Sequence, residues 1–119
     1  MKIFILLFLS ISLAFAILPQ RNWKIITPGA SSTTVVTPSA SEYVVIKSIL
    51  FSVLNASNMY FYYGAGITKV TPNMYFAAKG GMDKENVNIL VPKGNALKVW
   101  FNTSPGCDMG IDYQLETDN

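Results

Sequence analysis

Residues 42–54, EYVVIKSILFSVL, form the longest apolar run that follows the N-terminal segment of the chain. Successive side chains of a β-strand point to opposite faces, so the parity of the apolar positions indicates which face is buried. The parity changes halfway along this run, whose apolar set is Val44, Ile46, Ile49, Phe51 and Val53. A β-bulge at Lys47 and Ser48 would add one residue and bring both halves to one face. Alternatively, the strand is central and apolar on both faces; in either case it is predicted to be a core strand.

Residues 86–101, NVNILVPKGNALKVWF, predict a β-hairpin. Apolar and polar positions alternate on both sides of residues 92–96, where Pro92 fixes φ and Gly94 can adopt a positive φ. All six apolar side chains then lie on one face, in the pairs Val91 with Leu97, Ile89 with Val99, and Val87 with Phe101. In this register, Trp100 points away from the core.

Further segments with strand character are separated by turn residues. The chain closes with GIDYQLE at residues 110–116, whose apolar positions are predicted to point inward. Strands are also expected at residues 25–26, 33–37, 59–63 and 74–79. About eight short strands at this spacing predict an all-β fold, a small antiparallel β-sandwich or jelly roll.

The first residues have the pattern of an export signal. Residues 3–15, which follow Lys2, are almost entirely apolar, and Ala14-Phe15-Ala16 fits the small-x-small pattern of a signal peptidase site. The apolar run ends at Leu18 and is shorter than the roughly twenty residues that span a bilayer. Residues 1–16 are therefore predicted to be a helical signal peptide that is cleaved, and an uncleaved membrane anchor is the alternative. The mature protein is expected to be secreted, periplasmic or at the cell surface, with no membrane span.

The chain without this leader has the length of a single domain. Residues 17–41 include TPGASSTTVVTPSAS, which is rich in Ser, Thr, Pro and Ala, and are predicted to form an N-terminal arm. Within the arm, the β-branched residues 33–37 could instead form a short edge strand. Residues 42–119 are predicted to be the β-sandwich domain.

Cys107 is the only cysteine of the chain. The domain therefore cannot close an internal disulfide, and its stability must come from packing and backbone pairing. A buried, small apolar side chain is the expected role of this residue. Because the surrounding TSPGCDMG has the composition of a loop, a partly exposed thiol and an intermolecular disulfide are open alternatives.

The composition argues against most catalytic chemistry. The chain has no histidine, which removes the usual general base, Ser-His-Asp and Cys-His sites, and imidazole metal ligands. GAGITK at residues 64–69 lacks the spacing of a phosphate-binding loop and is predicted to be a turn. The net charge is +2, and the scattered lysines do not form the basic stripe typical of nucleic-acid-binding proteins. We therefore expect a non-enzyme that needs no cofactor and binds no nucleic acid.

Two pairs of carboxylates are the remaining candidates for a site. Asp108 and Asp112 lie in DMGID, and Asp83 and Glu85 lie in DKEN. Neither pair matches a loop of alternating oxygen ligands, so we expect no metal site, and Asp108 and Asp112 are the residues that a calcium ion would use. A small hydrolase would need two of these acids to converge in a cleft, whereas solvated loop residues are the simpler interpretation.

Four aromatic residues follow one another at 60–63 and precede a glycine. In a strand, Phe61 lies on the core face, so Tyr60 and Tyr62 are expected to point outward or toward a partner, as Trp100 does. Tyrosine and tryptophan are good strand formers that pair across a sheet, which is one explanation of the run. If the three rings cluster, they can instead form an aromatic platform for a sugar or a protein surface.

From Val44 onward, four segments occur in a characteristic order: VVIKSILFSVLN, MYFYYGAG, NILVPKGNALKV and GIDYQL. They read as a long apolar strand, an aromatic strand that ends in glycine, an apolar strand that runs into a turn, and a closing strand. This order resembles small virion-associated β-sandwich proteins of tailed phages, over residues 43–115. The resemblance implies a structural or decorating role without catalytic residues. The export signal departs from the pattern of those proteins.

Three functions fit these patterns. The first is a structural or adhesive surface protein that binds protein partners or copies of itself, with residues 31–37 adding as a strand to the open edge of a neighbour. The second is a carbohydrate-binding module that uses Tyr60, Tyr62 and Trp100. The third is a small hydrolase that uses the acidic loops. The sequence favours the first.

Overall fold

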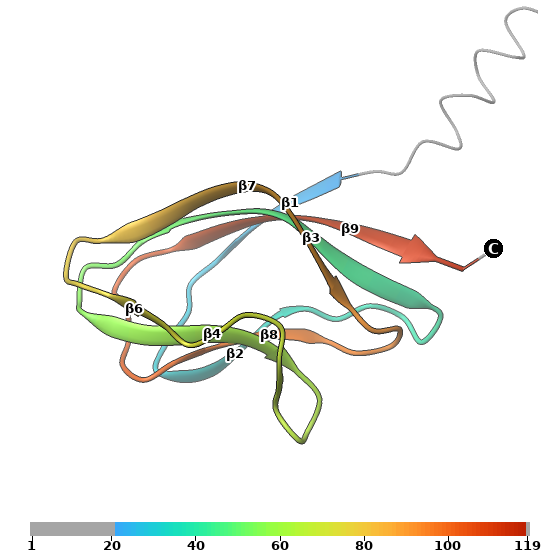
Figure 1. Ribbon diagram of the computed structural model, residues 1–119, viewed down its shortest axis with the longest axis horizontal. Coiled ribbons are helices and arrows are strands. Elements are labelled where there is room, and N and C mark those ends of the chain that lie inside the picture. The colour runs from blue at the N-terminus through green and yellow to red at the C-terminus, as the bar shows by residue number, and fades with distance from the viewer. Residues whose placement is uncertain (1–20, 119) are drawn as a thin grey trace, which may run out of the picture.

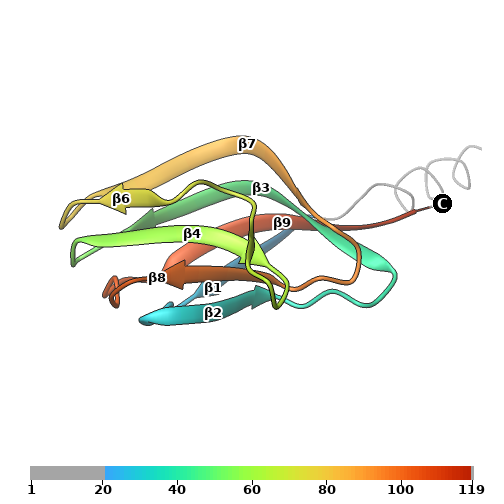
Figure 2. The same cartoon turned by 60° about the horizontal axis from the view of Figure 1, so that its bottom comes forward.

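The computed structural model describes residues 21–118, which form two antiparallel β-sheets in two layers (Figure 1). Sheet A has the spatial order β1 (Arg21–Ile26), β9 (Met109–Thr117), β3 (Glu42–Ser52) and β7 (Gly81–Val91). Sheet B has the order β2 (Ser31–Val36), β8 (Leu97–Phe101), β4 (Ser57–Tyr63) and β5 (Thr68–Lys69), and β6 (Met74–Phe76) also pairs with β4. Figure 2 shows the layers from another side, with β1 and β2 at one margin and β6 and β7 at the other.

The prediction of an all-β fold is confirmed, since residues 21–118 contain strands and turns and no helix. A membrane-spanning helix is accordingly absent from this part of the chain. The signal peptide that the sequence predicts at residues 1–16 lies outside the described residues.

Of the two alternatives for residues 42–54, the structure has the bulge, and it lies at Lys47. Against β9, Ile46 pairs with Tyr113 and Ser48 with Asp112, so Lys47 is one extra residue on β3. The strand can therefore keep one face toward the other sheet along its whole length. Apolar side chains from both halves of the run are buried, namely Val44, Ile46, Ile49, Phe51 and Val53.

The edge strand β7 is irregular where it lies opposite the bulge of β3. It has three residues, 86–88, opposite Lys47. Asn86 and Asn88 have positive φ angles of 57° and 50°, a conformation that asparagine adopts more readily than most residues. The Nζ atom of Lys47 donates a hydrogen bond to Oδ1 of Asn88 at 2.8 Å, which connects the bulge to the edge strand.

The core lies between the two sheets. The ring of Phe51 in sheet A meets Phe76 of β6 edge to face, with centroids 5.1 Å apart, and Phe101 of β8 at 6.4 Å. Burying one such large apolar side chain contributes about 1.5–3 kcal/mol to stability. Both layers contribute side chains that are at most 2% exposed, including Ile46, Ile49, Met109 and Ile111 from sheet A and Met59, Phe61, Leu97 and Val99 from sheet B.

The predicted hairpin of residues 86–101 is wrong. β7 pairs with β3 in sheet A, whereas β8 pairs with β2 and β4 in sheet B. Residues 92–96 therefore carry the chain from one layer to the other. The predicted inward faces are correct, because Val91 and Leu97 are both fully buried. They reach the core from opposite sheets, an arrangement that produces the same alternation along the chain as a hairpin does.

Residues 21–41, which were expected in the N-terminal arm, contain β1 and β2. β1 pairs with β9 and β2 pairs with β8, and each is the outermost strand of its sheet. This position agrees with the edge strand considered for residues 33–37. The Nζ atom of Lys24 on β1 donates a hydrogen bond to the carbonyl oxygen of Val35 on β2 at 2.7 Å. That bond connects the two layers at this margin.

Two connections between strands are tight turns. The segment predicted as a turn at residues 64–69 begins with one, in which Gly64 has a φ of 78° and its carbonyl oxygen accepts the N–H of Ile67 at 3.3 Å. The turn before β3 is held by Glu42, whose carboxylate accepts the N–H of Ser39 at 3.0 Å. Hydrogen bonds from the backbone and then the side chain of Ser39 lower the pKa of Glu42 from its usual value.

The bulge at Lys47 makes a prediction that compares two adjacent residues. Ile49→Ala should lower the free energy of unfolding by about 2–5 kcal/mol, because Ile49 is buried in the core. Leu50→Ala is the matched control and should cost less than about 1 kcal/mol, since Leu50 is 49% exposed. Urea unfolding measures both values. An unbroken alternation from Val44 would bury Leu50 instead, so the opposite order of effects would contradict the bulge.

Candidate functional site

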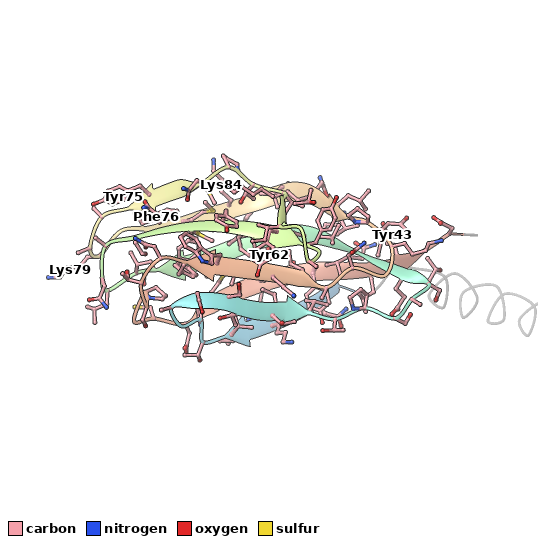
Figure 3. The ribbon with its side chains drawn as sticks, turned by 90° about the horizontal axis from the view of Figure 1, so that it is seen from below. Tyr43, Tyr62, Tyr75, Phe76, Lys79 and Lys84 are labelled. Atoms are coloured by element: carbon pink, nitrogen blue, oxygen red, sulfur yellow. The ribbon has the colours of Figure 1, made fainter. Side chains whose placement is uncertain are left out.

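The three aromatic residues expected to form a platform come together on the outer face of sheet B. Tyr60 of β4 lies directly opposite Trp100 of β8. Their rings stack with centroids 5.0 Å apart and 21° between the planes. Tyr60 also meets Tyr62 edge to face, at 5.6 Å between centroids. Figure 3 views the molecule from the side of sheet B and shows Tyr62 in the middle of this face.

The two tyrosines of this cluster are more deeply buried than an outward-pointing platform requires. Tyr60 is 9% exposed and Tyr62 is 5% exposed, although neither belongs to the core between the sheets. Neighbouring strands cover them from the sides. Lys69 on β5 places its Nζ atom 4.4 Å from the centroid of the Tyr60 ring, and Trp100 approaches that ring from the other side. The hydroxyl of Tyr62 is hydrogen-bonded to the hydroxyl of Ser32 on β2, two strands away.

These contacts limit what the aromatic cluster can do. Sugar binding by stacking requires an uncovered ring face, and Trp100 and Lys69 occupy the two faces of Tyr60. The cluster instead stabilises the sheet, since an aromatic pair contributes about 0.5–1.5 kcal/mol beyond its buried area. Glycan binding by Tyr60, Tyr62 and Trp100 stays a prediction.

The outer face of sheet A carries a cluster that was absent from the sequence predictions. Trp23 and Ile25 of β1 and Leu50 of β3 are 54%, 63% and 49% exposed. They line a shallow groove with a volume of about 400 Å³. Gly110 of β9 lies between them, opposite both Ile25 and Leu50. The ring of Trp23 covers Gly110 so closely that a Cβ atom there would overlap it. The groove therefore depends on a glycine in its floor.

The sequence contained one signal for this groove, the apolar pair Trp23 and Ile25 spaced two residues apart. Such spacing places both side chains on one face of a strand. It could not show which face, because the expected arm had no assigned partner strand. The groove forms only when the first strand pairs with the last, which brings Gly110 beneath Trp23.

A second groove of about 400 Å³ lies on the same face of sheet A, toward the opposite end. It is lined by Tyr43 and Leu90 together with Lys93, Glu116 and Asp118, and Lys93 forms an ion pair with Asp118. Burial raises the pKa of Tyr43 above its usual value of 10.0, and the carboxylates of Glu116 and Asp118 add to the effect. The ring of Tyr43 shares this groove with the exposed side chain of Leu90.

Of the four acidic residues considered from the sequence, only Asp108 lines one of the two grooves described above. Asp83 and Glu85, which were expected in a loop, belong to β7, and that expectation is wrong because β7 extends back to Gly81. Asp108 accepts a hydrogen bond from Oγ1 of Thr27 at 2.8 Å, while Asp112 lies within β9. Across residues 21–118, no group of three or more His, Cys, Asp or Glu side chains has the arrangement of metal ligands.

Cys107 lies in the connection between β8 and β9, where the surrounding sequence predicted a loop. Its thiol is free and the residue is half-buried. This environment matches the partly exposed thiol considered from the sequence more closely than a core position. The neighbouring Pro105 accepts the N–H groups of Leu54 and Asn55 at 2.8 and 3.2 Å, which holds this connection against the one between β3 and β4.

Comparison with known proteins does not assign the chain to a family. No protein-family model matches it, and searches of curated proteins and of solved structures also found no match.

The close approach of Trp23 to Gly110 can be tested with fluorescence. Gly110→Ala should push the indole ring off β9 and shift the Trp23 emission toward longer wavelength, as the ring becomes more exposed to water. This variant and its control would both carry Trp100→Phe, so that Trp23 is the only tryptophan in the chain. Gly66→Ala is the matched control, because a Cβ atom there would meet nothing within 4 Å. Equal spectra for the two alanine variants would show that Trp23 does not cover Gly110.

Proposed function

We propose that the protein is a non-enzymatic structural or adhesive surface protein that assembles with copies of itself through the outer face of sheet A. The observation that carries this proposal is the exposed apolar groove of Trp23, Ile25 and Leu50. Large apolar side chains that gather on one face mark interaction surfaces, whereas single exposed ones are ordinary. Leu90 lies on the same face, opposite Val45. Completing the burial of each half-covered side chain contributes on the order of 1 kcal/mol to association.

A structural role is also supported by the order in which the strands pair. The pairs are nested: β1 with β9, β2 with β8, β3 with β7, and β4 with β5 and β6. A single long hairpin, doubled over and rolled into two layers, would have this pairing. We therefore propose that the fold is a β-sandwich of the jelly-roll type, an architecture found in capsid and lectin domains. This agrees with the resemblance to virion-associated proteins, although a fold by itself does not establish a function.

A second route to assembly is strand addition at the margin of the molecule. Among residues 21–118, β2 pairs only with β8, so one edge of β2 has no partner strand. Its sequence, SSTTVV, contains neither a charged residue nor a proline, two features with which proteins protect an open edge. The irregularity of its pairing between Thr34 and Val36, and the bond from Lys24 to Val35, affect only the C-terminal part of the strand. Residues 31–37 remain the segment that we propose for this pairing. The export signal predicted at residues 1–16 would place such an assembly in the periplasm, at the cell surface or outside the cell.

Association should depend on the apolar groove. In sedimentation-velocity experiments over a concentration series, we expect the purified protein to form oligomers. Trp23→Ser should weaken association at least about tenfold, which corresponds to 1.4 kcal/mol. Leu54→Ser is the matched control, since Leu54 is 55% exposed and Trp23 is 54% exposed, but Leu54 lies in the connection after β3.

Two results would contradict the proposal. One is a protein that stays monomeric at every concentration. The other is an equal loss of association in the two variants, which would show that the groove has no special part.

The alternative function, a carbohydrate-binding module, is favoured by the contact among Tyr60, Tyr62 and Trp100. Trp100 is the least buried of the three rings, so we expect it to carry any stacking on a sugar. A glycan array should then show binding that Trp100→Ala abolishes and Tyr75→Ala preserves, because Tyr75 is exposed on β6, across β4 from Trp100. An array without any bound glycan would remove this alternative.

A further inference from the structure

The acidic residues of the chain are confined to one of the two layers. All seven lie in the strands of sheet A or directly beside them: Glu42, Asp83, Glu85, Asp108, Asp112, Glu116 and Asp118. The strands of sheet B contain no acidic residue, and their charged residues are Lys69 and Lys98. The two layers therefore differ in the sign of the charge that they carry.

The backbone register places the carboxylates of sheet A on its outer face. Asp83 pairs with Leu50 on β3, one position away from buried Ile49, so both side chains point away from the core. Three further acids pair with outward positions of β3 and lie on the same face: Glu85, Asp112 and Glu116.

The cations of sheet A cancel only part of this charge. Lys24 and Lys84 pair with the core residues Ile111 and Ile49 and so occupy inward positions. Lys47 is at the bulge, where it binds Asn88. Arg21 pairs with Gln114 at an outward position of the register, and Lys93 forms an ion pair with Asp118 on this face. The outer face of sheet A therefore has an excess of negative charge among its exposed apolar side chains.

The outer face of sheet B has the opposite character. Lys69 of β5 and Lys98 of β8 flank Tyr62 from its two sides in the register, and Tyr62 points outward. Lys69 is exposed and Lys98 is half-buried. Between them lies the aromatic cluster with Trp100. This face offers positive charge and ring edges to a partner.

We propose that copies of the protein stack face to face, with the outer face of sheet A of one copy against the outer face of sheet B of the next. This inference rests on the proposed self-assembly and specifies its geometry. Two A faces in contact would oppose carboxylates to carboxylates, and two B faces would oppose lysines to lysines, which disfavours both symmetric dimers. The remaining contact is heterologous, and a heterologous contact that does not close into a ring continues as a linear filament.

The layering of the strands is compatible with this contact. β7 lies at the same margin as β6, and β1 lies at the same margin as β2 (Figure 2). A translation along the stacking direction would therefore bring β7 of one copy over the β5 and β6 margin of the next. Asp83 and Glu85 would come to the side of the sheet where Lys69 lies. The apolar groove with Trp23 would meet the β2 and β8 side.

Two charge-reversed variants test the stacking by complementation. The first carries Asp83→Lys and Glu85→Lys on sheet A, and the second carries Lys69→Glu and Lys98→Glu on sheet B. In each variant alone, these four positions on the two outer faces would carry charges of the same sign. We therefore expect its association to weaken at least about tenfold. An equimolar mixture should recover the association of the wild type, because every reversed A face then meets a reversed B face. The readout is sedimentation velocity at an ionic strength of about 0.01 M, where charges interact over roughly 30 Å.

Lys79→Glu is the control for a reversed charge away from both faces, since Lys79 lies in the connection after β6, at the end of the molecule (Figure 3). It should associate as the wild type does. Circular dichroism and thermal unfolding of each variant confirm that the sheets are intact.

The possible results separate the stacking from the proposed function. Charge-reversed variants that associate as strongly as the wild type would overturn the stacking and leave self-assembly by another surface. Weak association that the mixture does not restore would also overturn it, because complementary faces would then not be in contact. A wild-type protein that never associates would overturn both proposals.

Discussion

One extra residue at Lys47 allows β3 to keep both of its apolar halves against sheet B, and the rest of the structure depends on it. Without the bulge, either the pair Val44 and Ile46 or the pair Ile49 and Phe51 would face water. Each such side chain is worth about 1.5–3 kcal/mol when buried, and a domain of this size is stable by only about 5–15 kcal/mol. Both neighbours of β3 follow the bulge, β9 by a shift of register and β7 by three irregular residues.

The outer faces of the two sheets differ in how far their large side chains are covered. This difference produces the candidate interaction surface. On sheet B, large side chains from adjacent strands cover one another, so that Tyr60 and Tyr62 are buried without a third layer. On sheet A, the central strand β9 has a glycine at position 110, and its neighbours Trp23, Ile25 and Leu50 remain half exposed around it. A face of this kind has apolar area available for a partner, whereas the face of sheet B is closed except for its edges and lysines.

Charge is sorted by the same topology. The acidic residues are scattered along the sequence, but the segments that contain them go to sheet A, and the segments between those go to sheet B. Alternation of consecutive segments between the layers therefore turns a chain of nearly balanced charge into a molecule with two unlike faces. Unlike faces favour heterologous contacts over symmetric ones. The exposed apolar side chains can therefore drive association while the charges set the orientation in which a second copy binds.

Within the apolar runs after residue 42, the sequence by itself indicated which side chains point inward, because alternation is a local property of a strand. It therefore predicted the all-β class, a core strand at residues 42–54 and the outward direction of Trp100, and it offered the bulge as one of two alternatives. Only the tertiary structure decided which strands pair. Residues 86–91 and 97–101 have the same pattern whether they form a hairpin or reach one core from two sheets, so the predicted hairpin failed although every predicted face was correct. The groove beside Gly110 could not be predicted for the same reason. It forms only when the first and last strands lie side by side, and a contact between such distant segments leaves no periodic signal in the chain.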